Sequence, residues 1–230
     1  MEFNTWEINN LIYVLALKHD KRTYCQYYFS LIQTKHIFIF SFFYSNDYNS
    51  KIIKIDLFFI NFIIVFTINA LFFRDSTIHT LYQKQGSYNI LDQLSQIVYS
   101  SLISSILNIV IKLFVLSEDN ILDFKKDKTK DNVNKRFKDL NKKLNVKFVL
   151  FFVSSFILLV FLGYYLAMFG IIYKNTQLHL IKDTLISYGL SLIYPFVFYL
   201  IPGMCRVPSL SNKSKKRNCL YKTSQLLQAI

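Results

Sequence analysis

The sequence contains little glycine, proline, cysteine or tryptophan, and it has none of the common motifs that build a catalytic or metal site. Its 230 residues include five glycines, three prolines, three cysteines and one tryptophan. It contains no Walker loop, no G-x-G-x-x-G, no G-x-S-x-G, no H-E-x-x-H and no C-x-x-C. The cysteines, Cys25, Cys205 and Cys219, suit neither a disulfide framework nor a zinc site. We therefore predict no enzyme activity, no catalytic residues, no cofactor and no bound metal.

Two further signals are weak or missing. The histidines are scattered, and the one close pair, Asp75 and His79, has no third ligand nearby. That pair suits either a loop cap or part of a metal site. The start of the sequence has no basic region and no small-residue cleavage site, so it does not resemble a secretory signal.

Acidic residues are scarce, and the excess of positive charge points to a membrane surface. The chain has 14 Asp and Glu against 27 Lys and Arg, which gives a net charge of +13. Such a balance suits either nucleic acid or an anionic membrane leaflet. Because the basic residues lie between long apolar runs, we expect contact with anionic lipid head groups through the basic tail and no nucleic-acid partner.

Large apolar residues are abundant and are grouped into long runs. Hydrophobic residues make up 53% of the chain, and its mean hydropathy is +0.29. A helix needs about 20 mostly apolar residues to cross a bilayer. Four stretches meet this requirement, so we predict an all-α integral membrane bundle of about four transmembrane helices. They are 57–73 (extendable back to Ile52), 94–116, 148–173 and 184–204.

The remaining segments complete a three-part division of the chain. Residues 1–50 are predicted to form a cytoplasmic amphipathic segment, with a helix from Thr5 to about Gln33 that starts in a capping box at Asn4 or Thr5 with Glu7. The apolar run His36–Tyr44 is too short to span and is either re-entrant, interfacial or buried. Residues 51–204 are predicted to form the four-span domain, with a charged linker at 117–147 that suits a helical hairpin or extension. Residues 205–230 are predicted to form a basic cytoplasmic tail.

The distribution of Lys and Arg predicts the orientation. With four spans, the segments 1–56, 117–147 and 205–230 lie on the same side of the membrane. These three hold twenty-two of the 27 basic residues. By the positive-inside rule both termini and the linker are cytoplasmic, in a membrane that the sequence does not identify. The sequon that begins at Asn212 then lies in the cytoplasm and is predicted to be unmodified.

Polar residues inside the predicted spans are the candidate site residues. In the second span, polar residues recur every four positions and form a stripe. The stripe suits either a water-filled pathway or a helix–helix contact in which its last residue, Lys112, reaches the membrane surface. Asn61 and Asn69 in the first span are predicted to bond other helices. In the fourth span Pro195 and Pro202 are possible kinks, which mark either a transport site or a packing bend. Pro202 with Gly203 also indicates a helix stop. Asp183 is predicted to cap the first turn of the fourth helix. The stripe consists of Gln96, Ser100, Ser104, Asn108 and Lys112.

Several strings spread over nearly the whole chain are distinctive, including INALFFRDSTIHTLY (68–82), YSSLISSILNIVIK (99–112) and the closing IPGMCRVPSL (201–210). They resemble a family of multi-pass membrane proteins of ciliates and other protists. Family members commonly have an acidic residue where this chain has Arg74. The resemblance implies a membrane module, often the C-terminal part of a longer chain, and implies no activity. A more distant likeness to the last helices of polycystin-type channels is analogy alone.

Two functions therefore stand as expectations. The first is a non-enzymatic structural anchor or assembly subunit, whose partners are the lipid bilayer and other membrane-protein subunits or a second copy. The alternative is a subunit of an oligomeric ion channel or transporter that uses the stripe and the bent fourth span. The direction in which the stripe faces distinguishes the two.

Overall fold

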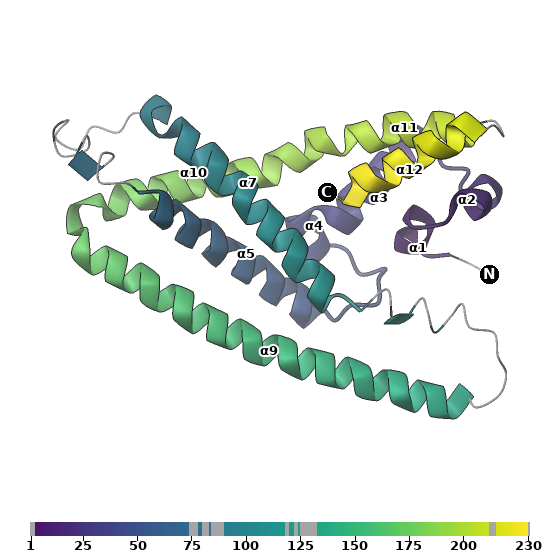
Figure 1. Ribbon diagram of the computed structural model, residues 1–230, viewed down its shortest axis with the longest axis horizontal. Helices are drawn as coiled ribbons and strands as arrows, with labels where there is room; N and C mark the ends of the chain where they lie inside the picture. Colours follow the sequence, from purple (N-terminus) through teal and green to yellow (C-terminus); the bar gives the residue numbers. More distant parts are fainter. Residues whose placement is uncertain are drawn as a thin grey trace. The chain divides into compact units, whose positions relative to one another are not determined.

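The computed structural model describes residues 3–73, 78, 79, 83, 90–117, 120, 121, 124, 133–211 and 215–229 (Figure 1). Regular structure within these residues is helical throughout, with no strand. Four of the helical segments are long and apolar enough to cross a membrane. The helices are α1 (Thr5–Asn9), α2 (Tyr13–His19), α3 (Tyr24–Lys35), α4 (Ile37–Phe42), α5 (Lys51–Phe72), α7 (Ile90–Val115), α9 (Val133–Ile172), η1 (Lys174–Thr176), α10 (Gln177–Phe198), α11 (Leu200–Leu210) and α12 (Lys215–Ala229).

The chain forms two compact units. Unit 1 comprises 1–55, 117–128 and 192–230, and unit 2 comprises 56–116 and 129–191. Helices α5 and α10 each contribute to both units. The predicted division at 50 and 204 remains a prediction.

The long helices agree with the apolar runs, with extensions that hydropathy alone does not reveal. Helix α5 includes the predicted extension back to Ile52, and α7 begins four residues before its predicted span. Helix α9 has 40 residues and begins fifteen residues before the apolar run at Phe148. The second half of the charged linker is therefore a helical extension of the third span. The charged residues at helical spacing in the first half of the linker, Lys126, Asp127, Lys130 and Asp131, lie outside the described residues.

The prediction of one helix from Thr5 to Gln33 is wrong, because local caps break this stretch into α1, α2 and α3. The predicted capping box is confirmed at α1: the backbone amide of Glu7 donates to Asn4 Oδ1 at 2.8 Å, and that of Asn4 donates to Glu7 Oε2 at 2.9 Å. Asp20 is extended, and Thr23 starts a second capping box with Gln26. The two boxes satisfy amides at the starts of α1 and α3, whereas α2 begins at Tyr13 without a side-chain cap.

In unit 1 the N-terminal and C-terminal helices share a core. Helix α11 packs on α3 and on α12, and α12 also contacts α2. Figure 1 shows α12 folded back beside α11. Tyr27, Leu31 and Ile32 of α3 form one cluster with Tyr199, while Leu11, Ala16 and Tyr221 form another. The region predicted as a basic tail thus contains a helix with a buried face.

Short helix α4 is joined to the start of α5 by a buried lysine. Lys54 is 2% exposed, and its ammonium donates to the Tyr44 carbonyl and to Asp47 Oδ1, the latter at 2.9 Å. The ammonium also lies 5.0 Å from the centre of the Phe40 ring. The Ser41 hydroxyl donates to the Lys54 carbonyl at 2.8 Å. Lys54 was counted among the basic residues of the cytoplasmic segment 1–56, but its side chain is buried and links α4 to the start of α5.

In unit 2 an apolar cluster joins the end of α5, the end of α9 and the start of α10. Its buried members are Ala70, Phe73, Ile78, Phe169 and Leu180. The chain turns from α9 to α10 through η1, and Gln177 Nε2 donates to the Gly170 carbonyl at 2.6 Å. This cluster packs these three helix ends together within unit 2.

Candidate functional site: the buried polar contacts

A closed group of polar side chains joins three helices in unit 2. The Ser100 hydroxyl of α7 donates to Asn69 Oδ1 of α5 at 2.8 Å. The hydroxyl oxygens of Ser100 and Ser187, from α10, lie 2.7 Å apart, and the Ser187 hydroxyl also donates to the Ile97 carbonyl at 3.1 Å. Ser100, Asn69 and Ser187 are each 0% exposed. We call these three residues the serine–asparagine node.

The node is possible because each helix presents a small or short polar side chain at the contact. Serine lets the backbones approach closely, and its hydroxyl then finds a partner across the helices. The Asn69 amide also donates to the Val65 carbonyl at 3.0 Å, and Gln96 Nε2 donates to the Asn69 carbonyl at 3.4 Å. Asn69 lies in the last turn of α5, where carbonyls lack helical donors, so Gln96 completes the helix end.

The rest of the predicted stripe follows α7 away from the node. The Ser104 hydroxyl donates to the Ser100 carbonyl of its own helix at 2.6 Å, a bond that satisfies it without a partner helix. Asn108 is buried at 8% exposure, and Lys112 is half-buried. The structure thus brings Gln96 and Ser100 to α5, and Ser100 also to α10, while Ser104 bonds within α7.

Other polar side chains of unit 2 are also buried, among them the predicted Asn61. Asn61 of α5 is 4% exposed, and Tyr188 of α10 packs edge-on against the Phe58 and Phe62 rings at 5.9 and 5.1 Å. Asp183 was predicted to cap the first turn of the fourth helix, and this is wrong. Helix α10 begins at Gln177, so Asp183 lies in its second turn, where it is 0% exposed.

The two predicted kink residues lie on either side of a helix break at Tyr199. Pro195 lies inside α10, which ends at Phe198, and Pro202 is the third residue of α11, which begins at Leu200. Each proline lacks the amide that a continuous helix would use, while the first turn of a new helix tolerates that loss. Pro202 with Gly203 is not a helix stop, since α11 continues to Leu210.

Three side chains from the N-terminal region bond carbonyls along this break. The Tyr24 hydroxyl donates to the Leu200 carbonyl at 2.9 Å, and the Tyr28 hydroxyl donates to the Phe196 carbonyl at 2.9 Å. His36 Nε2 lies 2.8 Å from the carbonyl oxygen of Leu192. The three carbonyls are four residues apart, as on one helix face, and their partners run antiparallel to them. We call this arrangement the carbonyl ladder.

A second buried polar group lies in unit 1, and the sequence interpretation missed it. Arg206 of α11, 1% exposed, donates from Nε to Asp20 Oδ2 at 2.9 Å, and its other nitrogens donate to the carbonyls of Asn9 and Ile8 at 2.9 and 2.7 Å. Arg22 donates from Nε to the other oxygen of Asp20 at 2.7 Å. We call these residues the arginine–aspartate cluster.

Aromatic rings and amides of α3 and α12 surround the arginine–aspartate cluster. The Arg206 guanidinium lies 4.8 Å from the ring centres of both Tyr27 and Tyr221. The Tyr27 hydroxyl donates to Gln228 Oε1 at 2.8 Å, and Gln228 Nε2 donates to the Asn9 carbonyl at 3.0 Å. Burial raises the pKa of Asp20, but hydrogen bonds and charge from Arg22 and Arg206 outweigh this and hold its pKa below the usual value.

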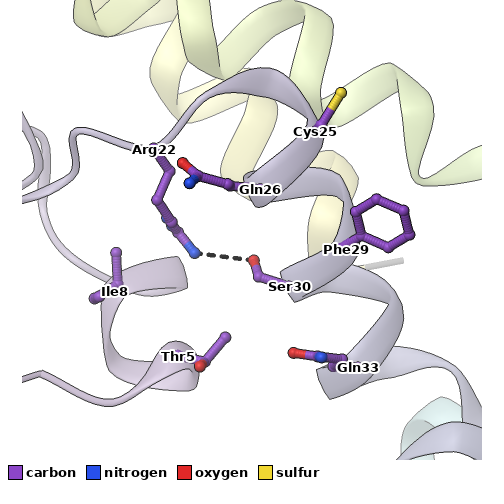
Figure 2. Close-up of a pocket in the computed structure, with 8 residues that line it drawn as sticks. All are labelled: Thr5, Ile8, Arg22, Cys25, Gln26, Phe29, Ser30 and Gln33. Carbon is purple, nitrogen blue, oxygen red and sulfur yellow. Dashed lines mark hydrogen bonds between the residues drawn. The ribbon is translucent and has the colours of Figure 1, made fainter.

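A pocket of about 470 Å³ lies beside the arginine–aspartate cluster, between α1 and α3 (Figure 2). Thr5 and Ile8 line one side, and Cys25, Phe29 and Gln33 are among the residues that line the other. Arg22, the only charged lining residue, is committed to Asp20, Asn9 and Ser30. The pocket therefore has no uncommitted charge with which to hold an anion.

Within the described part of the chain, no group of three His, Cys, Asp or Glu side chains could hold a metal ion. Of the predicted pair Asp75 and His79, Asp75 lies outside the described residues, as do Arg74 and the Asn212 sequon. Comparison with protein-family models, with curated proteins and with solved structures found no match.

Proposed function

We propose that the chain is a non-enzymatic, multi-pass membrane protein that acts as a structural anchor or assembly subunit. The serine–asparagine node carries this proposal. In a pathway, the polar side chains of α7 would face water. Instead the hydroxyl of Ser100, the second member of the stripe, is enclosed between α5 and α10, with 0% exposure for Ser100, Asn69 and Ser187. A closed contact of this kind suits helix packing.

The surface of α9 supports the assembly role. Only 11% of the most apolar 18-residue stretch of α9 is buried inside the chain. Phe156 and Phe161 are 69% and 68% exposed, and Val149 is 63% exposed. In a bilayer this face would contact lipid, other membrane-protein subunits or a second copy.

The orientation belongs to the same proposal. Both termini and the charged linker are placed in the cytoplasm by the distribution of Lys and Arg. The carbonyl ladder supports docking of α3 beside the cytoplasmic half of the fourth span, because Phe196 and Leu200, the partners of Tyr28 and Tyr24, lie in its second half. The likeness to the protist membrane family and the role of the basic tail on anionic head groups remain parts of the proposal.

Reconstitution tests the proposal against the channel alternative. Purified protein in liposomes loaded with an ion-sensitive dye is expected to give the flux of empty liposomes, with an added ionophore as positive control. A flux that disappears in the Asn108→Leu variant would contradict the anchor role and support the channel alternative. Affinity purification of a tagged chain from its own membrane is expected to recover partner membrane proteins or a second copy in stoichiometric amount.

A further inference from the structure

Helix α9 continues well beyond the apolar run as a single unbroken helix. Fifteen residues, 133–147, precede Phe148, which corresponds to about 22 Å at 1.5 Å per residue. Neither glycine nor proline occurs in this stretch, so no kink is built into it. We call residues 133–147 the α9 extension.

One face of the α9 extension is apolar. Val133, Phe137, Leu140 and Leu144 are separated by four, three and four residues, the spacing at which side chains line up along one seam of a helix pair. Val133 is 49% exposed and Phe137 is 59% exposed, while the two leucines are half-buried. Water-exposed seams of this kind are interaction surfaces, since an exposed apolar patch is costly to leave uncovered.

The rest of the α9 extension is strongly basic. It carries six Lys and Arg against one Asp, Asp139. Lys143 lies next to the apolar seam at helical spacing, and Lys138 and Lys142 occupy the opposite face, where both are exposed. Like charges on two paired extensions would repel, so a second copy is a poor partner for this seam.

The geometry also disfavours the bilayer as the occupant of the seam. Phe137 is eleven residues before Phe148, or about 16 Å along the helix. The head-group layer is about 5–8 Å thick on each side of the hydrocarbon, and charges are screened beyond about 8 Å at physiological salt. A helix that leaves the membrane without a break therefore holds Phe137 and Lys138 beyond the head groups, while Leu144, about 6 Å from Phe148 along the helix, lies level with them.

We propose that the α9 extension binds an acidic amphipathic helix of a partner protein, with apolar side chains against Phe137 and Leu144 and carboxylates against the flanking lysines. This inference rests on the proposed assembly function, since it places Phe148 at the membrane edge. Charge complementarity sets the chemistry of the partner, because apolar contact supplies affinity and opposite charge fixes the pairing.

A designed peptide tests this surface on the purified full chain in uncharged detergent. The probe is a fluorescent helical peptide with Leu at heptad positions a and d and Glu at e and g, and binding is measured by anisotropy. We expect saturable binding that Phe137→Ser and Lys143→Glu each weaken about tenfold, because the first removes an apolar contact of the seam and the second reverses a charge beside it. Val146→Ser is the matched control: Val146 is 52% exposed on another face, so its replacement leaves binding unchanged.

The results separate this inference from its competitors and from the proposed function. Absence of binding, or equal binding by all variants, overturns it. In a native membrane, a photo-crosslinker at position 137 is expected to capture an acidic helical segment of another protein. Crosslinks only to lipid would favour a membrane contact, and crosslinks only to this chain a self-contact; either overturns the inference. Neither experiment depends on ion flux, so their failure would leave the anchor test unaffected.

Discussion

Asp20 accepts a hydrogen bond from Nε of Arg206 at 2.9 Å, although the two residues are 186 positions apart in the sequence. Both side chains are almost fully buried, at 2% and 1% exposure. The pair therefore ties the N-terminal helices to α11 within unit 1. A buried ion pair stabilises only while both partners remain, because removal of one leaves a charge without its counter-ion.

Replacement of Arg206 by Met should destabilise unit 1 by about 3–5 kcal/mol, because Asp20 and the carbonyls of Ile8 and Asn9 lose their donor. Unfolding in detergent can be followed through the reactivity of Cys205, the neighbouring half-buried thiol. Lys222→Met is the matched control, since Lys222 is exposed on α12. Equal stability of the two variants would show that the arginine–aspartate cluster contributes nothing.

Acid should weaken unit 1 through Asp20. The pKa of Asp20 in the folded chain is lower than its ordinary value of 3.8, so the ionised carboxylate is favoured by folding. The stability it contributes is present above about pH 4 and is lost as the pH falls through the lowered pKa. We expect the difference in unfolding free energy between the natural chain and Asp20→Asn to shrink over this range. A difference that stays constant as the pH falls would contradict the assignment.

The four long apolar helices were predictable, because a bilayer requires a minimum length of apolar helix and that length can be counted in a single sequence. The arginine–aspartate cluster was not, because its partners are distant in sequence and an isolated Arg206 in a basic region is typical of a solvated residue. Pairing of this kind depends on which helices pack together. The same holds for Asn69 and Ser100, whose polarity in the spans was visible but whose contact was not.

Errors at element boundaries have local causes. Asn4 and Thr23 both start capping boxes, but only the first was recognised, so one helix was predicted where three form. The fourth helix begins earlier than hydropathy indicates, because Gln177 and Lys182 are polar but compatible with a helix. Asp183 consequently lies inside α10.

Gly203 should not tolerate a side chain. A Cβ there would lie 2.7 Å from Cε2 of Tyr24, so the ring would have to move and its hydrogen bond to the Leu200 carbonyl would be lost. We expect Gly203→Ala to cost about 1–3 kcal/mol, as overpacking does. Gly163→Ala is the control, since nothing lies within 4 Å of its Cβ and alanine favours a helix. A second change, Tyr24→Ala, should remove most of the cost, and persistence of the cost would point to another cause.

Native thiols can report the proposed orientation. Cys25 and Cys219 are exposed. In sealed vesicles with the outer face outward, a membrane-impermeant maleimide should label neither until the vesicles are permeabilised. A Lys174→Cys variant without the native thiols should react at once, because Lys174 lies between the third and fourth spans and is exposed. The reverse pattern would invert the topology, and labelling of only one of Cys25 and Cys219 in sealed vesicles would refute an even number of spans.

The serine–asparagine node should be measurable as a coupling energy. Ser100→Ala and Asn69→Ala, alone and together, form a double-mutant cycle on the 2.8 Å hydrogen bond between α7 and α5. Polar contacts between membrane helices average about 0.6 kcal/mol and reach about 1.7 kcal/mol, so we expect a coupling in this range.

Ser105→Ala is the matched partner for the control cycle with Asn69→Ala, because the Ser105 hydroxyl donates to the Ser101 carbonyl of its own helix. That cycle should show no coupling. Coupling at Ser100 together with liposomes that conduct no ions would assign the stripe to helix packing. If Ser100 and Asn69 are uncoupled, the two side chains act independently, and the observation that favours an anchor over a channel subunit is lost.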